Sequence, residues 1–408
     1  MSLHGRGCSG QRSASARAPT RPCKDIEGET LTVSAHNTGP TPDPELAALR
    51  EQIDSVDRQL FDLLNQRAQI VLKVGELKHR TGAPVYRPER EAQILGRLGQ
   101  SAGPLPGAAL QSIWREVMSA CRALERRLRV AYLGPPGTFS EMALLAHFGH
   151  GVEPVACPSI DEVFRSTEAG NTDFGVVPVE NSTEGAVNRS LDLMLQTPLS
   201  VLGETAVDVR HNLMTRSGTR TGIVKVCAHP QALAQCAGWL DRNLSGIERV
   251  PVSSNAEGAR LASLDDTVAG IAAETAAAVY SLVITDAGIQ DDPSNRTRFL
   301  IVGRYRCGAS GADQTSLILS VPDRAGAVHA LIEPLARHGV SMKRFESRPA
   351  RQGGWEYYFY IDLIGHQDDP PVAAALAEIR DHAAFFKVLG SYPRALGHTT
   401  PVPPTTRP

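Results

Sequence analysis

The sequence lacks long apolar runs and has little net charge, and these two absences exclude broad classes of protein. Its most apolar region, 261–289, is interrupted by Asp265, Asp266 and Glu274, so no stretch of about 18 uncharged apolar residues can form a membrane span. The chain has 42 Lys and Arg against 44 Asp and Glu, a net charge of -2, which argues against a dedicated nucleic-acid surface. We therefore expect a globular protein without membrane or nucleic-acid partners.

Cysteines are few and dispersed. The chain has 7, with no CxxC pair and no Cys/His cluster at zinc spacing. This pattern predicts a reduced, cytoplasmic protein without a structural metal. The length of 408 residues and the 42% hydrophobic content indicate ordinary packed cores in about three domains.

Both ends of the chain read differently from the middle. Residues 1–43 are rich in Gly, Ser, Thr, Pro and Arg and show no helical or strand period, which predicts a disordered tail. The arginines before Asp25 give this tail a faint likeness to a transit peptide, but a dispensable tail or a misplaced start is the favoured interpretation. Residues 396–408 are Pro-rich, which predicts a second, frayed tail.

Residues 44–128 have the pattern of three helices. Apolar residues recur at spacings of 3 and 4 from Leu46 to Leu77, which predicts one long amphipathic helix. Pro88 is typical of the first position of a second helix, and a third carries an apolar stripe from Ile113 to Leu128. Three helices, one of them very long, cannot bury the whole stripe of the long helix alone, so we expect an intertwined partner subunit.

Cations interrupt this apolar pattern. Arg67 falls on the apolar seam, and a buried arginine needs an anion, either an internal glutamate or a ligand. Arg50 and Lys78 flank the same stripe about 42 Å apart along one helix, whereas Arg67 and Lys78 are about 16 Å apart. A small ligand that contacts all three must take Arg50 from a second subunit. The spacing therefore predicts a homodimer with shared sites.

The segments ELAALREQIDSVDRQLFDLLNQRAQIVLKVGELK and PEREAQIL resemble the all-helical chorismate mutase family over about residues 45–127. The resemblance implies rearrangement of chorismate to prephenate without a cofactor, by holding a chair-like conformer and stabilising charge. It implies Arg67 and Lys78 as catalytic residues that bind the carboxylates and the ether oxygen. The substrate contacts that it implies are Arg50, Arg67, Lys78, Arg90, Glu91, Cys121 and Glu125.

Two positions on this stretch depart from some members of that family. Arg87 stands where some have an acidic residue, and Glu125 where some have a neutral glutamine. A glutamate that contacts the ether oxygen must be protonated to donate a hydrogen bond, which would favour the rearrangement at lower pH. The alternative for Glu125 is a solvated charge at the end of the third helix.

Residues 129–305 alternate short apolar strands with polar turns and helices, which predicts an α/β domain. The loop GPPGTFS lies between a strand and a helix, so Thr138 and Ser140 could bind an anion there or could form an N-capped turn. Polar loops follow other strands in the same way, as in VENSTEG and NRTRF. Polar groups gathered at strand ends predict a cleft.

The segments RVAYLGPPGTFSEMA, VVPVENSTEGAV, AHPQALAQC and NRTRF resemble the prephenate dehydratase family over about residues 129–303. The resemblance implies a two-lobed domain that converts prephenate to phenylpyruvate without a cofactor, with Thr297 essential as a hydrogen-bond donor or relay. For Arg298 a core-facing salt bridge is an equal alternative to a substrate contact. The expected substrate contacts are Thr138, Ser140, Glu180, Asn181, Gln235, Arg298 and Phe299.

Residues 314–395 follow the order strand, helix, strand, strand, helix, strand, which is ferredoxin-like. The unit resembles ACT regulatory domains, and its first motif has Val-His where Leu-Val is usual. The resemblance implies L-phenylalanine bound between paired domains and feedback inhibition. The residues that match the two phenylalanine-binding motifs are Gly326, Ala327, Val328, Glu346, Ser347, Arg348 and Pro349.

Together these patterns predict a multidomain protein in which an all-α mutase domain precedes a two-lobed α/β dehydratase domain and an α+β ACT domain. The expected function is that of a bifunctional enzyme of L-phenylalanine biosynthesis. In one alternative only the dehydratase is active and the helices serve dimerisation, which the retained Arg50, Arg67 and Lys78 disfavour. In another the chain is an amino-acid-binding regulator built on a solute-binding fold, which the TRF motif disfavours.

Overall fold

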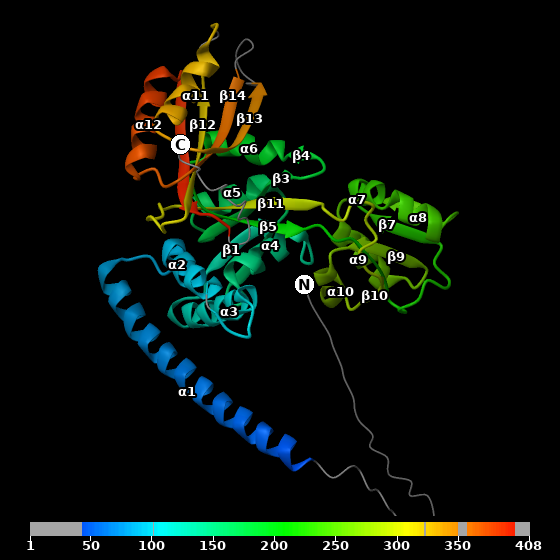
Figure 1. The fold of residues 1–408 in the computed structure, drawn as a ribbon. Helices are drawn as coiled ribbons and strands as arrows, with labels where there is room; N and C mark the ends of the chain where they lie inside the picture. The colour runs from blue at the N-terminus through cyan, green and yellow to red at the C-terminus, as the bar shows by residue number, and fades with distance from the viewer. Residues whose placement is uncertain (1–42, 101, 322–323, 350–356, 396–408) are drawn as a thin grey trace, which may run out of the picture. The chain divides into compact units, whose positions relative to one another are not determined.

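The computed structural model describes residues 43–100, 102–321, 324–349 and 357–395 (Figure 1). The predicted tail 396–408, and all but the last residue of the predicted tail 1–43, lie outside the described residues. Contacts divide the chain into two units, Met1–Gln59 and Leu60–Pro408, and the boundary falls inside the first helix.

The helical domain consists of α1 (Pro44–Thr81), α2 (Pro88–Gly99) and α3 (Gly107–Glu125), as predicted. Pro88 occupies the start of α2, where its missing N–H costs no helical hydrogen bond. None of the 38 residues of α1 is buried, and Ile53 and Ile70 are 59% and 55% exposed. The apolar stripe that the sequence pattern predicts on α1 is therefore uncovered within one chain.

The first lobe is built on a mixed sheet in the order β2-β1-β3-β11-β5, with β4 paired to β3. Here β1 is parallel to β2 and β3, whereas β11 is antiparallel to β3 and β5. Helices α4, α5 and α6 pack against this sheet. The elements are β1 (Arg129–Leu133), α4 (Phe139–Phe148), β2 (Glu153–Cys157), α5 (Ile160–Glu168), β3 (Phe174–Asn181), β4 (Gly185–Ala186), α6 (Asn188–Gln196), β5 (Ser200–Asp208) and β11 (Arg296–Gly303).

The second lobe carries its own sheet in the order β10-β6-β9-β7-β8. The chain enters this lobe after β5 and returns from β10 to β11, so two segments connect the lobes. The elements are β6 (Asn212–Thr215), β7 (Lys225–Ala228), α7 (Pro230–Gln235), α8 (Ala237–Asn243), β8 (Glu248–Pro251), α9 (Asn255–Leu264), β9 (Val268–Ala272), α10 (Glu274–Val279) and β10 (Val283–Asp286).

This architecture confirms the two-lobed α/β prediction, although several strands were not predicted. Among them, β2 and β8 are only partly buried and only 5 and 4 residues long. A short, half-exposed strand leaves little hydrophobic pattern to read.

The C-terminal domain has the predicted ferredoxin-like order, with a sheet β13-β14-β12-β15. Helices α11 and α12 cover one face of the sheet (Figure 1). On the other face Tyr360, Leu389 and Tyr392 share one core with the first lobe. The elements are β12 (Asp313–Ser320), α11 (Ala327–Arg337), β13 (Met342–Pro349), β14 (Tyr357–Ile364), α12 (Pro370–His382) and β15 (Phe385–Pro393).

The C-terminal domain approaches the first lobe closely where β15 meets β5. A Cβ atom on Gly390 would lie 2.3 Å from the carbonyl oxygen of Val201, closer than any side chain can be accommodated. The missing side chain of Gly390 therefore allows the two sheets to touch backbone to backbone.

The helical domain also shares a core with the first lobe. The Tyr86 ring, between α1 and α2, lies 5.3 Å from the rings of both Phe148 and Phe174, measured between centroids. Its hydroxyl lies 2.8 Å from Nε2 of His147, and the Tyr305 hydroxyl donates to its carbonyl oxygen at 2.8 Å. This part of the helical domain is thus anchored in the core of its neighbour.

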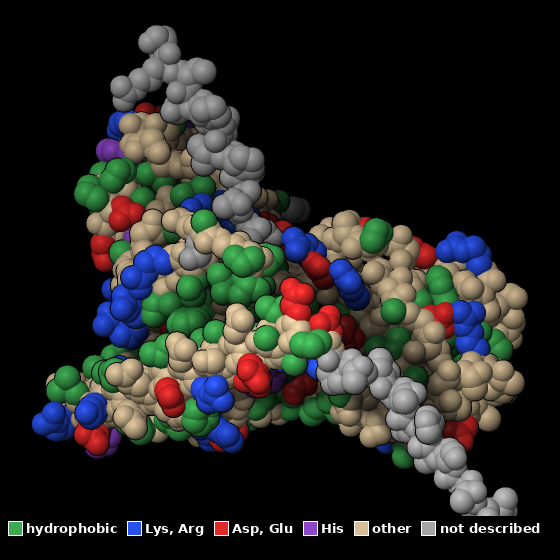
Figure 2. Space-filling model, turned by 60° about the horizontal axis from the view of Figure 1, so that its bottom comes forward, with side chains coloured by type: hydrophobic (Ala, Val, Ile, Leu, Met, Phe, Trp, Pro, Cys, Tyr) green, Lys and Arg blue, Asp and Glu red, His purple; other side chains and the backbone are tan. Residues whose placement is uncertain are grey.

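The surface shows no concentration of charge of one sign on the face in view, and the described residues include no candidate for a membrane-spanning helix or a metal site. Positive and negative side chains are interspersed on the face shown in Figure 2. Among the described residues, no helix is both long and apolar enough to cross a membrane, and no group of His, Cys, Asp and Glu has the geometry of a metal site.

We expect the His147 ring to make the fold sensitive to acid. Burial, with Arg115 and Arg122 nearby, lowers the pKa of His147 to about 3. Below about pH 6.5 this histidine is protonated in the unfolded chain but stays neutral in the folded chain. The free energy of unfolding therefore decreases by about 1.4 kcal/mol per pH unit until the pH reaches the folded pKa. Calorimetric Tm values between pH 7 and pH 4.5 should fall less steeply for His147→Gln than for the parent.

The matched control is His79→Gln, because His79 is exposed at the end of α1. Its Tm should follow the parent curve. Parallel curves for His147→Gln and the parent over the whole range would contradict the prediction.

Candidate active sites and regulatory contacts

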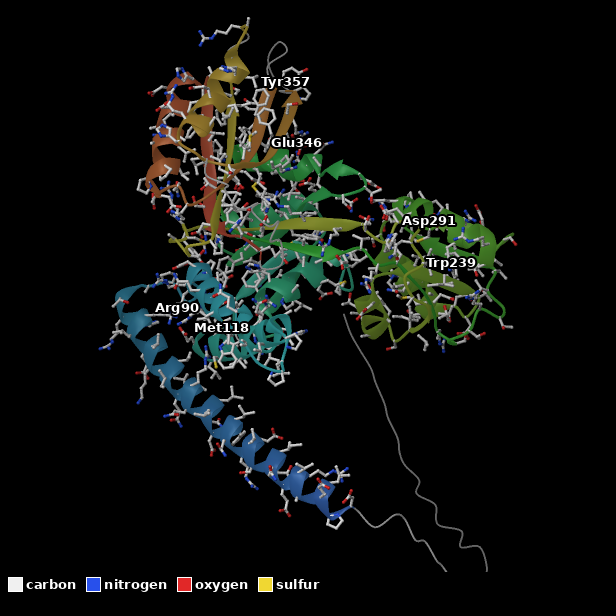
Figure 3. The ribbon with its side chains drawn as sticks, in the orientation of Figure 1. Arg90, Met118, Trp239, Asp291, Glu346 and Tyr357 are labelled. Atoms are coloured by element: carbon white, nitrogen blue, oxygen red, sulfur yellow. The ribbon has the colours of Figure 1, made fainter. Side chains whose placement is uncertain are left out.

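A cavity of about 420 Å³ lies among the three helices of the helical domain. Arg90 on α2 and Met118 on α3, both labelled in Figure 3, are two of its lining residues. All lining residues belong to the unit that begins at Leu60. The sequence-predicted residues that line this cavity are Arg67, Lys78, Arg90, Glu91, Cys121 and Glu125.

Arg67 has an unmet hydrogen bond in this cavity. One terminal guanidinium nitrogen, Nη1, is buried and has no hydrogen-bond partner. In the described parts of the chain Arg67 also forms no ion pair, so the internal Arg–Glu pair that the sequence left open is not observed. A buried cationic nitrogen without a partner is costly, and an anionic ligand would remove that cost.

Lys78 and Glu125 meet across the cavity. The Lys78 Nζ atom lies 3.1 Å from Oε2 of Glu125 and donates to the carbonyl oxygen of Val85 at 3.1 Å. The Glu125 side chain is only 7% exposed, so the alternative of a solvated charge was wrong. A Cβ on Gly75 would lie 2.9 Å from Cγ of Glu125, so the glycine leaves room for α3 against α1.

Glu91 forms an ion pair with Arg122, a residue that the sequence analysis did not identify. Arg122 on α3 forms an ion pair with Oε1 of Glu91, and its other terminal nitrogen donates to the carbonyl oxygen of Phe148 at 2.7 Å. Arg87 and Met118 also line the cavity without a predicted role. A single arginine on a helix gives no distinctive sequence pattern, and only the packing shows which face of the helix it occupies.

Arg50 belongs to a different unit of the chain from the residues that line the cavity. It is an exposed residue of the unit that ends at Gln59, and it does not line the cavity. On the same segment of α1, Leu49 and Ile53 are 51% and 59% exposed. The one-chain cavity therefore lacks the third predicted cation.

A second group of polar side chains surrounds Thr297 in the first lobe. Strands β3 and β11 place Asn181 opposite Thr297, and Asn181 Nδ2 donates to Oγ1 of Thr297 at 2.9 Å. The same nitrogen donates to Oδ1 of Asn295 at 2.9 Å. Because the Thr297 oxygen accepts from Asn181, its own hydroxyl proton is available for a further acceptor.

This group continues into the second lobe. Asn295 Nδ2 donates to Oε1 of Gln235 at 3.1 Å, and Nε2 of His211 lies 2.9 Å from the same oxygen. The amide nitrogen of Gln235 donates to Glu184 at 3.4 Å. A chain of hydrogen bonds therefore connects Thr297 to both lobes.

The sequence analysis did not identify His211 as a site residue. It lies between β5 and β6, on one of the two connections between the lobes. Burial lowers the pKa of His211, and the hydrogen bond with Gln235 partly opposes this. Its ring packs edge-on against Phe139, with centroids 5.7 Å apart. His211 is therefore neutral near pH 7 and suits hydrogen bonding more than charge pairing.

A cleft of about 680 Å³ lies between the lobes, but the loops VENSTEG and NRTRF, which predicted a cleft, are not among its lining residues. The glycine loop with Thr138 and Ser140 lines it from the first lobe, and His229 and Asn255 line it from the second. The Thr138 hydroxyl donates to the carbonyl oxygen of Leu133 at 3.1 Å and makes no capping bond to α4, so the N-capped turn was wrong for this side chain. Ser140 is buried.

Arg298 and Glu180 contact the C-terminal domain, and Phe299 is a core residue of the first lobe. Arg298 Nε lies 2.8 Å from Oε2 of Glu204, and its Nη1 lies 2.9 Å from Oδ2 of Asp362 in the C-terminal domain. Phe299 is buried in the core of the first lobe. The structure thus gives Arg298 the core-facing salt bridge, because adjacent residues of a strand point to opposite faces.

Glu180 also points towards the C-terminal domain. Its Oε2 lies 3.2 Å from Nε of Arg344 on β13, and Arg344 pairs with Glu346 on the same strand. Glu180, Arg298, Arg344 and Asp362 line a cavity of about 340 Å³ between the first lobe and the C-terminal domain. We expected Glu180 and Arg298 to contact substrate, and the structure places both at this domain interface.

The two predicted phenylalanine motifs lie on α11 and β13. Gly326 has a φ of 81° and precedes α11, a left-handed conformation that favours glycine. Ala327 is buried, whereas Val328, Ser347 and Pro349 are exposed. Strand β13 is an edge of its sheet, and Glu346 on it (labelled in Figure 3) lies opposite Tyr360 on β14. An exposed edge strand can accept a second copy of the domain.

Arg348 connects the second motif to the first lobe. Its Nη1 donates to Oδ1 of Asp192 at 2.9 Å and to the carbonyl oxygen of Asn188 at 2.9 Å, both on α6. The Tyr360 hydroxyl on β14 donates to the carbonyl oxygen of Leu191 at 2.9 Å. Helix α6 is therefore bound directly by the C-terminal domain.

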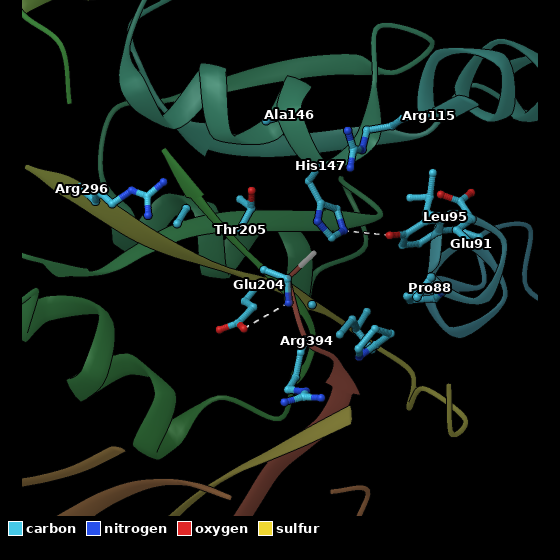
Figure 4. A pocket seen from close by; sticks show the side chains of 17 residues that line it. Pro88, Glu91, Leu95, Arg115, Ala146, His147, Glu204, Thr205, Arg296 and Arg394 are labelled. Atoms are coloured by element: carbon cyan, nitrogen blue, oxygen red, sulfur yellow. Dashed lines mark hydrogen bonds between the residues drawn. The ribbon is translucent and has the colours of Figure 1, made fainter. Parts of the chain in front are cut away.

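A smaller cavity of about 190 Å³ lies where the helical domain, the first lobe and the segment after β15 meet (Figure 4). Glu91, His147, Glu204 and Arg394 are among its lining residues. The sequence analysis did not predict this cavity, because its walls come from separate segments spread between Tyr86 and Ala395.

Comparison with known proteins identifies relatives over nearly all of the described chain. The model of type II chorismate mutase matches residues 49–126, that of prephenate dehydratase residues 130–306, and that of the ACT domain residues 315–381. A bifunctional chorismate mutase/prephenate dehydratase of Neisseria gonorrhoeae is 49% identical over 360 residues, 87% of this chain and 99% of that relative.

Solved structures match the part that follows the helices. Prephenate dehydratase of Arthrobacter aurescens in complex with L-Phe is 34% identical, with a TM-score of 0.60, over 66% of this chain and 90% of that one. A protein described as GqqA, a novel type of quorum-quenching acylase, has the same TM-score of 0.60 at 26% identity, over 66% of this chain and 98% of its own.

Proposed function

This chain belongs to the family of bifunctional chorismate mutase/prephenate dehydratases, and from that premise we propose which of its residues perform and control the two reactions. The helical domain is the chorismate mutase domain, and the two lobes form the dehydratase domain. The observation that carries the proposal is the pair of separate polar sites, one around Arg67 and one around Thr297. We also propose a cytoplasmic location, because the cysteines in the described chain are free thiols.

In the mutase site we propose that Arg67 and Lys78 bind the carboxylates and the ether oxygen of chorismate, and that Arg90 helps to fix the ring end. The rearrangement transfers no group, so its rate depends on the bound conformer and on charge that develops at the breaking C–O bond. The unpartnered Arg67 nitrogen supports an anion at this position. Glu91 would bind the ring end, and Cys121 would line the pocket beside it.

Glu125 has a specific requirement in this proposal. It pairs with Lys78 in the free site, so it must take up a proton before it can donate to the ether oxygen beside that ammonium group. This keeps the expectation that the rearrangement is faster at lower pH. A rate that rises steadily from pH 5 to pH 8 would contradict this role.

We propose that the mutase site is completed by Arg50 from a second copy of the chain in a homodimer. The support is the uncovered apolar stripe of α1, on which Leu49, Ile53 and Ile70 are more than half exposed. A stripe of this length needs a partner that buries it, and a second long helix with the same spacing is complementary to it. The cavity of one chain already contains Arg67 and Lys78.

Mixing two inactive variants tests the shared site. Arg50→Ala and Lys78→Ala should each lower mutase activity at least tenfold, because each removes a cation that faces the substrate anion. Co-refolding them in equal amounts should restore about a quarter of parental activity, since half of the dimers would have one intact site out of two. Activity is measured as loss of chorismate absorbance.

The control for mixing is Arg50→Ala co-refolded with Arg67→Ala, which should also recover activity, whereas Lys78→Ala with Arg67→Ala should not, because those two cations come from one chain. No recovery with Arg50→Ala in either mixture would contradict sharing between subunits.

In the dehydratase site we propose that Thr297 donates a hydrogen bond to the departing hydroxyl of prephenate, either to stabilise it directly or to relay a proton from solvent. Loss of the ring carboxylate as CO₂ leaves its electron pair in the ring, the C–O bond breaks, and the hydroxyl leaves with a proton as water. Aromatisation drives the step, so the protein needs only an oriented donor. Asn181 orients Thr297 by donating to its oxygen at 2.9 Å, and Gln235 carries the network into the second lobe.

Thr297→Ala should reduce the turnover of added prephenate at least a hundredfold, because the donor is removed. Thr297→Ser keeps the hydroxyl and should retain a substantial part of the rate. Phenylpyruvate is measured by its absorbance in alkali, and mutase activity of the same samples reports that the chain is folded. Near-parental dehydration by Thr297→Ala would contradict the assignment.

We propose that L-phenylalanine binds at the motifs Gly326–Val328 and Glu346–Pro349 of paired C-terminal domains and inhibits dehydration. The related dehydratase solved with L-Phe supports this ligand. Arg344 gives a direct route to the active site, because it contacts Glu346 of the second motif and Glu180, the neighbour of Asn181. A ligand that moves Glu346 would therefore move the strand that orients Thr297.

Arg344→Gln separates binding from coupling. The variant should bind L-phenylalanine within about threefold of the parent by calorimetry, but the residual dehydratase rate at saturating ligand should rise about tenfold, since coupling energies of this kind are worth 1–3 kcal/mol. The matched control is Arg337→Gln, which removes an exposed arginine of the same domain. Equal inhibition of Arg344→Gln and the parent would rule out this route, and a parent insensitive to millimolar L-phenylalanine would rule out the regulation itself.

A further inference from the structure

Arg122 lies behind the mutase site, and no predicted role accounts for it. Its side chain is 5% exposed, which is rare for an arginine and requires that its charge be matched. It lies on α3 one residue after Cys121, and it contacts groups from three parts of the chain. Those groups are Glu91 on α2, the carbonyl oxygen of Phe148 at the end of α4, and the ring of Tyr86.

The contacts of Arg122 hold Glu91 in one orientation. One terminal nitrogen of the guanidinium donates to Oε1 of Glu91, and the other donates to the Phe148 carbonyl oxygen at 2.7 Å. The guanidinium carbon lies 5.0 Å from the centroid of the Tyr86 ring. A planar cation that is bonded on two sides and stacked on a third cannot change position without breaking a charge-assisted bond.

The anchor of this arginine belongs to the other catalytic domain. Phe148 ends α4 of the first dehydratase lobe, and the rings of Tyr86, Phe148 and Phe174 pack together in its core. Close backbone packing supports the same junction, since a Cβ on Gly149 would lie 2.6 Å from Cβ of Ser119 on α3. The dehydratase lobe is therefore a rigid support for the back of the mutase site.

We infer that Arg122 is a positioning residue of the chorismate mutase reaction: it orients the Glu91 carboxylate towards the substrate and fixes it to the dehydratase domain through the Phe148 carbonyl. The inference rests on the proposed role of Glu91 in binding the ring end. It makes the dehydratase domain a structural part of the mutase site within one chain. Mutase activity then depends on a residue that acts through Glu91.

A double-mutant cycle on the full-length protein tests this role. Glu91→Gln and Arg122→Gln should each lower mutase kcat/KM, by up to about a hundredfold, because a misplacement of about 1 Å in a binding group is enough for such a loss. In the Glu91→Gln background, Arg122→Gln should cost less than about threefold, since the residue through which it acts is already changed. Arg122→Lys keeps the charge and should recover part of the loss.

Two controls separate positioning from general damage. The turnover of added prephenate by each variant reports whether the dehydratase lobe and the junction are folded, and it should stay within about twofold of the parent for Arg122→Gln. Arg126→Gln is the matched variant. Arg126 directly follows the same helix and forms an ion pair with Asp173 of the first lobe at 2.7 Å, not with Glu91. Its mutase kcat/KM should equal that of the parent.

The outcomes distinguish this inference from the site on which it rests. If Glu91→Gln retains the parental mutase rate, the proposed role of Glu91 fails. If Glu91→Gln loses activity but Arg122→Gln does not, only the positioning role fails. A full additional loss from Arg122→Gln in the Glu91→Gln background would show that Arg122 contacts the substrate itself and would overturn the inference, as would a loss of prephenate turnover equal to the loss of mutase activity.

Discussion

The alternation of side chains along β3 and β11 is the constraint on which the dehydratase domain depends. These strands pair antiparallel in the middle of the first sheet, with Asn181 opposite Thr297 and Glu180 opposite Arg298. Because successive residues of a strand point to opposite faces, the proposed catalytic residues and the proposed regulatory contacts occupy the two sides of the same two strands. Thr297 and Asn181 are connected through Asn295 to Gln235 in the second lobe, whereas Arg298 and Glu180 contact the C-terminal domain. Under the proposed regulation, the C-terminal domain therefore contacts the residues next to the proposed active site directly.

The charges at that interface are numerous, buried and matched. Arg298 contacts Glu204 and Asp362. Despite the burial of both groups, Arg298 and Lys343 lower the pKa of Glu204, and Tyr392, Asp362 and Glu204 raise the pKa of Arg298. A buried group of this kind is strongly destabilised when one partner is lost. It therefore specifies the docking of the C-terminal domain, as Gly390 does by allowing backbone contact with β5.

A different physical problem shapes the helical domain. Its long helix exposes an apolar stripe that one chain does not cover, while the mutase cavity ends against the dehydratase lobe through Arg122 and Tyr86. The proposed shared site and the inferred contact of the dehydratase lobe with the mutase site have one cause, which is that the helical domain of one chain has too small a hydrophobic core. A small bundle with one long helix needs packing from neighbouring elements, which here are the next domain and the proposed second copy of the chain.

The sequence alone determined the order of the domains, most helices, the ferredoxin-like unit and the residues gathered in the mutase cavity, because periodic apolar patterns and family motifs are local properties of the chain. It also assigned Thr297 and Asn181 to one polar site, but it expected both on loops, whereas the structure has them on the paired strands β11 and β3. It could not show that Arg298 turns away from Thr297, that Glu125 is paired with Lys78, or that His211 and Arg122 join the sites. Those facts depend on which strand face or helix face meets which neighbour, and only tertiary packing brings together residues that lie far apart along the chain.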